Sequence, residues 1–302
     1  RHLKQLDMPW DTFEQIVHSF SHLKHVELQG EGEPLLHPRF FDMVQSLKEL
    51  YPDIRVSTIT NGSLFGEENV QQLLKLGLHK IYVSMESAEP DDFYAIRGGN
   101  LQKVTQGIHL LMQRRRSLGL RYPSVGFAVT VLRRTVHAMP QIAALYDRLG
   151  LDGGFSIQPL QIMPNYEKYY SDEVRDQMLT EADHRTFLAS LSTNLYVQHV
   201  LQKPEAGRSF FREMTLDANN VSTGCIWLNR GLFINAEGVA LPCCYVKDSK
   251  RDGLGRIGVD DDQILERRAW MQKQLQNGIT PSGCVNCDFA KKVVSKSNSP
   301  NS

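Results

Sequence analysis

Short β-type runs alternate with amphipathic helical stretches as far as Ile162. The expected strands are short and rich in β-branched or aromatic residues, and they cover residues 25–29, 54–60, 80–84, 125–131 and 155–159. The expected helices cover residues 10–23, 40–50, 69–76, 101–118 and 140–149. Repeats of this kind join parallel strands through right-handed crossovers. We therefore predict an α/β fold with a parallel sheet, either open or closed into a barrel.

Length, charge and hydropathy limit the classes of partner. Hydrophobic residues make up 41% of the 302, enough to bury one large core or two smaller ones. The formal net charge is zero, so the chain as a whole exerts no general attraction on nucleic acid. No apolar run approaches the roughly 18 residues that a membrane-spanning helix needs. We therefore expect neither nucleic acid nor a membrane among its partners.

Small and acidic residues follow the first three expected strands. Residues 30–34 (GEGEP) follow the first strand, Asn61 and Gly62 the second, and Glu86 the third. Ligands of parallel sheets bind at the carboxyl ends of the strands, where small residues permit close approach of the backbone. Carboxylates placed there can accept hydrogen bonds from an ammonium group or from ribose hydroxyls. The register of these residues at successive strand ends predicts a binding site at this edge.

All five cysteines lie in the last third of the chain. They are Cys225, Cys243, Cys244, Cys284 and Cys287. Their absence from the rest of the chain argues against a disulfide framework and favours a reducing, cytoplasmic compartment. A Cys-x-x-Cys turn and the two ends of a hairpin can together enclose one metal centre with four thiolates. The spacing alone leaves both zinc and an iron–sulfur cluster open.

Several of these segments resemble radical S-adenosylmethionine (radical SAM) enzymes. Residues 28–38 (LQGEGEPLLHP) look like the Gly-Glu-Pro motif of that family and its extension. Residues 60–62 (TNG) resemble the segment after the family's third strand, and residues 83–87 (VSMES) the ribose-contacting segment after its fourth. Residues 92–99 (DFYAIRGG) are similar to the helix-capping stretch that follows. The resemblance implies a partial (β/α)6 barrel.

The same resemblance implies a set of cofactor-binding residues. Glu33 and Glu86 would position S-adenosylmethionine (SAM), with further contacts at the same edge of the barrel. The full set is Gly32, Glu33, Pro34, Asn61, Ser84, Glu86 and Gln158.

The carboxy-terminal cysteines resemble those of an auxiliary cluster domain. Cys225, twelve residues, Gly238, four residues and Cys243 follow the pattern of the SPASM domain, and the small number of cysteines fits its shorter "twitch" form. The resemblance implies a small α+β domain that holds one auxiliary [4Fe-4S] cluster on Cys225, Cys243, Cys284 and Cys287. Cys244 is the spare thiol, although an exchange of roles between Cys243 and Cys244 stays open.

One departure from the family is large. Radical SAM enzymes hold their reducing [4Fe-4S] cluster on a Cys-x-x-x-Cys-x-x-Cys loop after the first barrel strand, and here that strand and that loop are absent. The chain as printed is therefore not expected to make the 5'-deoxyadenosyl radical, because three thiolates are needed to hold that cluster. We favour truncation of the chain as the explanation for the missing strand and loop. The other explanation is a degenerate relative that kept the barrel for binding and lost the chemistry.

The expected organisation is a truncated radical SAM barrel over 1–165, a helical bridge over 166–215, a SPASM/twitch domain over 216–292 and a disordered tail over 293–302. For the intact enzyme the resemblance implies an oxidoreductase or peptide maturase with a second [4Fe-4S] cluster. It would oxidatively modify a peptide or small-molecule substrate, with an electron donor such as flavodoxin or ferredoxin. The alternatives are a catalytically inactive relative and a zinc-knuckle binding module.

Overall fold

The chain folds into two compact units. The computed structural model describes residues 6–161, 168–202 and 225–285, together with Cys287, Ala290, Lys291, Val293 and Val294. The larger unit comprises His22–Gln161 and Glu173–Leu216. The smaller unit combines Arg1–Ser21, Ile162–Asp172 and Asp217–Ser302. Tyr166, at the expected start of the helical bridge, lies outside the described residues, as do residues 203–224 and the tail beyond Val294.

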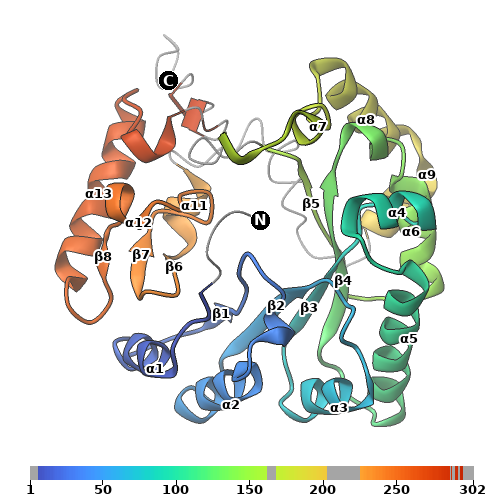
Figure 1. Cartoon of the computed structure of the whole chain (residues 1–302), viewed down its shortest axis with the longest axis horizontal. Helices are drawn as coiled ribbons and strands as arrows, with labels where there is room; N and C mark the ends of the chain where they lie inside the picture. The colour runs from blue at the N-terminus through green and yellow to red at the C-terminus, as the bar shows by residue number, and fades with distance from the viewer. Residues whose placement is uncertain are drawn as a thin grey trace. The chain divides into compact units, whose positions relative to one another are not determined.

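A parallel sheet forms the centre of the larger unit. Its strands are β1 (His25–Glu27), β2 (Arg55–Thr60), β3 (Lys80–Ser84), β4 (Ser124–Val131) and β5 (Phe155–Pro159). They pair in sequence order, every neighbouring pair is parallel, and the sheet curls into a half-barrel (Figure 1). This confirms the predicted α/β fold, a partial barrel of the radical SAM type.

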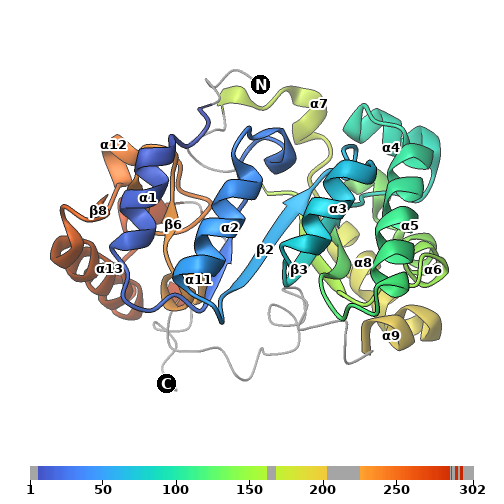
Figure 2. The same ribbon diagram turned by 90° about the horizontal axis from the view of Figure 1, so that it is seen from below.

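Helices cover the convex face of the sheet (Figures 1 and 2). They are α2 (Phe40–Leu50), α3 (Glu67–Lys75), α5 (Leu101–Ser117) and α6 (Met139–Arg148). Helix α2 buries Phe40, Met43, Val44 and Leu47, whose spacing places them on one side of a helix. On β3 the residues that alternate toward the helices, Ile81 and Val83, are fully buried, while Lys80, Tyr82 and Ser84 are only half-buried. The opposite face of the sheet therefore carries the polar side chains of β3.

Short helices lie beyond the carboxyl ends of the strands and after β5. They are η1 (Pro34–Leu36), α4 (Pro90–Arg97), η2 (Arg133–Thr135), α7 (Asp172–Arg175), α8 (Glu181–Thr193) and α9 (Leu195–Gln202). Helix α8 begins with a capping box in which Thr180 and Asp183 bond each other's backbone N–H groups. The backbone N–H of Arg133 donates to the carbonyl of Gln177 at 2.9 Å. The segment before α8 is thereby fastened to η2.

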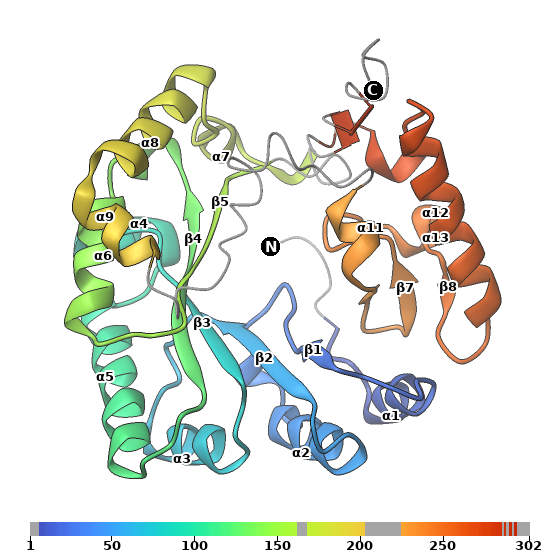
Figure 3. The same ribbon diagram turned by 180° about the vertical axis from the view of Figure 1, so that it is seen from behind.

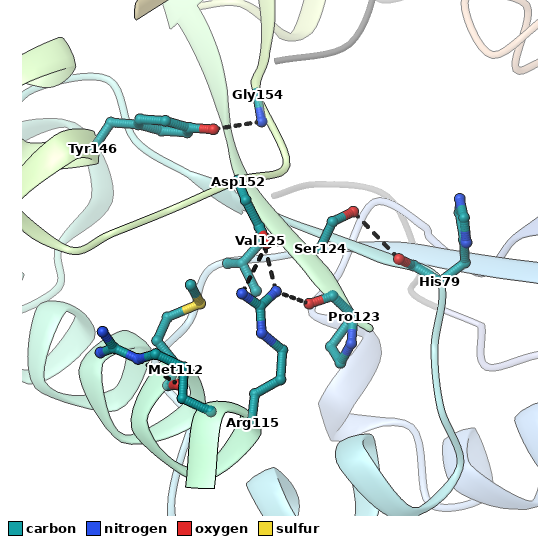
Figure 4. A network of polar contacts seen from close by, with 10 residues as sticks. His79, Met112, Arg115, Pro123, Ser124, Val125, Tyr146, Asp152 and Gly154 are labelled. Atoms are coloured by element: carbon teal, nitrogen blue, oxygen red, sulfur yellow. Dashed lines mark hydrogen bonds and ion pairs between the residues drawn. The ribbon is translucent and has the colours of Figure 1, made fainter. Parts of the chain in front are cut away.

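Arg115 and Asp152 form an ion pair at the amino-terminal edge of the sheet (Figure 4). Arg115 of α5 is buried, with 8% of its side chain exposed, and its Nη2 lies 2.8 Å from Oδ2 of Asp152. Its Nη1 also donates to the carbonyl of Pro123 at 2.6 Å. Asp152 Oδ1 accepts the backbone N–H of Val125 at 3.0 Å. One guanidinium and one carboxylate thus join the end of α5, the start of β4 and the loop before β5.

The smaller unit is built around an antiparallel sheet (Figure 3). The strands β6 (Phe233–Ile234), β7 (Val239–Leu241) and β8 (Gly255–Arg256) pair in that order. The helices are α1 (Trp10–His18), α11 (Ile226–Arg230), α12 (Ser249–Asp252) and α13 (Asp261–Gln276), and η5 (Ser282–Cys284) follows. The hairpin tip is fixed by Asn235, whose Oδ1 accepts the backbone N–H groups of Glu237 and Val239.

Helix α1 belongs to the smaller unit. Ile16 joins the apolar cluster that includes Leu228, Ala240 and Leu275, and Gln15 Nε2 donates to the carbonyl of Ile257 at 3.4 Å. The expected division at residue 165 had placed this helix with the barrel, whereas its residues group with the carboxy-terminal unit and Ile16 packs in that unit's core. None of the helices in the described part of the chain is long and apolar enough to cross a membrane.

Candidate cofactor sites

Glu33 joins the loop after β1 to the end of β2. Its Oε1 accepts the Thr60 hydroxyl at 2.6 Å and the backbone N–H of Leu35 at 3.2 Å, and its Oε2 accepts the backbone N–H of Asn61 at 2.6 Å. A carboxylate can accept about four hydrogen bonds. Three are therefore used to fix the loop, and one remains for a ligand. We call this set of bonds the Glu33 clasp.

The turn after β2 has a defined shape. The backbone N–H of Gly62 donates to Thr60 Oγ1 at 3.0 Å, and that of Ser63 donates to Asn61 Oδ1 at 2.8 Å. Gly62 has φ of +71°, and a side chain there would meet Val83 and Val104 at 3.0 Å. Only glycine suits this position. The turn therefore holds the half-buried Asn61 beside the Glu33 clasp.

Glu86 is paired with Arg97 of α4. Only 2% of its side chain is exposed, its Oε2 accepts Arg97 Nε at 2.6 Å, and its Oε1 accepts Arg97 Nη2. A fork of this kind is a strong, charge-assisted contact. Helix α4 ends at Gly98, which has the left-handed conformation common at helix ends. Glu86 therefore presents its carboxylate to Arg97, which keeps 33% of its own side chain exposed.

The remaining predicted residues lie along the same edge. Thr60 pairs with Val83, so Asn61 and Ser84 occupy neighbouring positions on adjacent strands. Gln158, which is exposed, pairs with Thr130 on the far side of the sheet. A Cβ atom at Gly32 would have open space around it. The structure thus brings Glu33, Asn61 and Ser84 to the same part of this edge. Gln158 lies on β5, two strands away from Ser84.

A polar cluster on the sheet face opposite the helices was not predicted. Ser57 Oγ lies 2.8 Å from Nε2 of His25 and 3.5 Å from Oε2 of Glu27, and Lys80 Nζ donates to the Tyr82 hydroxyl at 3.3 Å. Burial, with the charge of Glu27, raises the pKa of Tyr82 to about 12. Burial also lowers the pKa of Lys80. The alternation of Lys80, Tyr82 and Ser84 with apolar residues could have revealed this face from the sequence.

Three of the five cysteines lie in or against the core of the smaller unit. Cys225 and Cys284 are buried, and Cys287 packs against the same apolar cluster. Burial raises the pKa of the Cys243 thiol to about 12, and the Cys244 and Cys225 thiols raise it as well. The Cys243 thiol therefore interacts electrostatically with the Cys225 thiol.

The Cys-x-x-Cys segment forms a tight turn. Cys284 ends η5, and the backbone N–H of Cys287 donates to the carbonyl of Cys284 at 3.1 Å. Burial raises the pKa of the Cys284 thiol, and the Cys287, Cys243 and Cys225 thiols raise it further. Within the residues that the structure describes, no three His, Cys, Asp or Glu side chains form a ready metal site. The chemistry of the donor set, three thiols in this core and the Cys243 thiol after the hairpin, suits a soft metal centre.

Comparison with known proteins identifies the family. A family model described as the radical SAM superfamily matches residues 2–144. The "tungsten-containing aldehyde ferredoxin oxidoreductase cofactor-modifying protein" of Pyrococcus furiosus is 32% identical over 303 residues, which is 94% of this chain and 80% of that protein. The chain belongs to the radical SAM superfamily.

A further relative matches a smaller part of this chain. A probable GTP 3',8-cyclase of Methanococcus aeolicus is 24% identical over 186 residues, and the match spans 59% of this chain and 58% of that protein.

Among solved structures, native anSMEcpe with bound AdoMet has a TM-score of 0.66 at 15% identity, covering 95% of this chain and 79% of that one. SuiB of Streptococcus suis bound to S-adenosylmethionine has a TM-score of 0.62 at 16% identity, covering 96% and 66%. At these identities the likeness to the solved structures shows the fold alone.

The family implies SAM and a [4Fe-4S] cluster that cleaves it. The residues of the larger unit do not fit that cluster, because the sequence contains no cysteine before Cys225. The carboxylate of the Glu33 clasp does fit SAM, since it keeps one acceptor position for an ammonium group.

Proposed function

We propose that this protein is a radical SAM-type enzyme that modifies a small molecule or a peptide. In this proposal the carboxyl edge of the half-barrel binds SAM, and the smaller unit holds an auxiliary [4Fe-4S] cluster. The Glu33 clasp supports the assignment of SAM to this edge, because three hydrogen bonds, two of them at 2.6 Å, fix a carboxylate at the strand ends where ligands of parallel sheets bind. The work of these residues is to bind and orient SAM.

Each predicted residue has a task in this proposal. Glu33 accepts a hydrogen bond from the ammonium group of SAM, and Gly32 and Pro34 keep the backbone close to it. Asn61 and Ser84 line the same edge, and Gln158 lines it from β5. Glu86 is assigned to the ribose hydroxyls, and Arg97, which keeps 33% of its side chain exposed, holds the Glu86 carboxylate in place.

Four cysteines would hold the auxiliary cluster: Cys225, Cys243, Cys284 and Cys287. When bound, such a cluster supplies one-electron redox chemistry. Cluster binding is expected to draw the four sulfurs closer, because metal binding and local folding are coupled.

The substrate is a small molecule or a peptide. The Pyrococcus relative is named for modifying the cofactor of another enzyme, which favours the small-molecule branch. The peptide branch has weaker support, because the peptide-bound neighbours share the fold at low identity. A cytoplasmic electron donor of the flavodoxin or ferredoxin class completes the proposal, and the cysteine usage favours that compartment.

One observation favours a second candidate. The four cysteines of the smaller unit would also suit one tetrahedral zinc ion. The second candidate is therefore a catalytically inactive relative that binds through a zinc knuckle.

SAM binding tests the proposed function. We expect Glu33→Gln to weaken SAM binding about tenfold to a hundredfold, because a hydrogen bond to a charged group is worth about 1.5–3 kcal/mol. Isothermal titration calorimetry of the anaerobic protein with SAM measures this. The matched control is Glu31→Gln, which neutralises an exposed carboxylate in the same loop.

The control separates a specific contact from a general loss of charge. Glu31→Gln should bind SAM as the wild type does, and thermal melting should show that both variants remain folded. Equal weakening by both substitutions, or a wild-type protein that gives no heat with millimolar SAM, would contradict the proposed site.

A further inference from the structure

Helix α12 lies between the two segments that supply the cysteines. Ser249 Oγ donates to Oε2 of Glu237 in the hairpin tip at 3.2 Å, and the backbone N–H of Leu254 donates to the carbonyl of Ala240 on β7 at 2.8 Å. Cys243 lies two residues after the end of β7. The helix is therefore fixed to the hairpin that presents one of the proposed ligands.

The last residue of α12 contacts the other cysteine segment. Asp252 is buried, with 3% of its side chain exposed, and its Oδ1 accepts the hydroxyl of Ser282 at 2.9 Å. Its Oδ2 accepts Arg251 Nε at 2.7 Å and lies 2.6 Å from Arg251 Nη2. Ser282 begins η5, the short helix that ends at Cys284. One side chain thus joins α12 to the turn that presents Cys284 and Cys287.

Packing reinforces this hydrogen bond. A Cβ atom at Gly283 would lie 3.2 Å from Cγ of Asp252 and 3.3 Å from its Cβ. The backbone of the turn therefore lies directly against the carboxylate, and glycine at position 283 permits that approach. A buried carboxylate also needs its partners, because leaving it unpaired is costly. The side chain of Asp252 and the backbone of the cysteine turn therefore pack closely against each other.

We propose that Asp252 is a positioning residue for the auxiliary cluster, and that it holds the Cys284–Cys287 turn against the hairpin through its bond to Ser282. Asp252 does not ligate the cluster in this proposal. The proposal rests on the proposed function, because it concerns the cluster assigned there. Residues that orient ligands in this way typically change metal affinity about 10- to 100-fold when they are replaced.

Variants of Asp252 separate the hydrogen bond from the charge. Asp252→Ala removes the acceptor of Ser282, and Asp252→Asn keeps an oxygen for Ser282 while it removes the negative charge. The measured quantity is the rate at which a ferrous chelator removes iron from the anaerobically reconstituted full chain. We expect Asp252→Ala to lose iron about tenfold faster or more, and Asp252→Asn to stay close to the wild type.

Two further variants serve as comparisons. Ser282→Ala removes the other partner of the bond and should also accelerate iron loss, and it keeps the test valid where Asp252→Ala fails to fold. Asp248→Ala removes the cap of α12, which accepts the backbone N–H groups of Lys250 and Arg251, without touching the cysteine turn. It should accelerate iron loss less than Asp252→Ala does, because Asp252 keeps its own bond to Ser282 in this variant.

The outcomes distinguish the two proposals. A wild-type protein without iron overturns both the auxiliary cluster and the role of Asp252. A wild-type protein with a cluster that Asp252→Ala and Ser282→Ala release no faster than Asp248→Ala overturns only the role of Asp252. Faster loss from Asp252→Ala and Ser282→Ala, with Asp252→Asn near the wild type, supports the inference.

Discussion

Cys243→Ser is expected to abolish iron retention by the smaller unit, whereas Cys244→Ser is expected to leave it near the wild-type level. The Cys243 thiol acts electrostatically on the Cys284 thiol, which belongs to the Cys-x-x-Cys turn. Loss of one thiolate of four leaves one iron of a cubane without its protein ligand. Iron and inorganic sulfide per chain, measured after anaerobic reconstitution, give the result.

Cys244→Ser serves as the matched control for Cys243→Ser. Both substitutions exchange sulfur for oxygen at adjacent positions, so a general effect of the exchange on folding would appear in both. Iron loss from Cys244→Ser with retention in Cys243→Ser would reverse the ligand assignment. Retention in both would remove Cys243 and Cys244 from the set of essential ligands.

Arg115→Met is expected to lower the free energy of unfolding of the larger unit by about 3 kcal/mol. Breaking a buried ion pair costs about 3–5 kcal/mol because one charge is left without its partner. The lower end applies because Asp152 keeps 32% of its side chain exposed. The carbonyl of Pro123 also loses its donor. Urea unfolding followed by circular dichroism measures the change.

Arg114→Met is the matched control for this prediction. Arg114 precedes Arg115 on α5, and its pair with Glu67 is exposed, at 53% and 66% of the two side chains. Exposed ion pairs contribute about 0–1 kcal/mol. A loss of stability in Arg115→Met no larger than in Arg114→Met would show that the amino-terminal edge does not depend on the buried pair.

Much of the barrel could be predicted from the sequence. The strands β2 to β5 are short runs of β-branched and aromatic residues, and their periodicity placed them within one residue of the observed bounds. The expected helix over 10–23 ends at His18, and the expected strand over 25–29 ends at Glu27. Helix α4 was missed because only Phe93 of its residues is buried, so its apolar periodicity is weak.

The contacts that build the sites depend on tertiary structure. The motif predicted that Glu33 lies at a strand end, but its bonds to Thr60 and Asn61 depend on how the loop meets β2. The pairing of Glu86 with Arg97 likewise requires α4 to fold back on β3. The packing of α1 in the smaller unit joins Gln15 to Ile257, 242 residues apart in sequence. No local pattern carries such information.

The metal content of the anaerobically purified chain tests the central claim most directly. Because its cysteines all lie in the smaller unit, any iron–sulfur cluster held by its thiolates reports on that unit alone. The account predicts about four irons and about four sulfides per chain, with the brown colour of an iron–sulfur protein. A colourless protein with about one zinc per chain and no inorganic sulfide would contradict it.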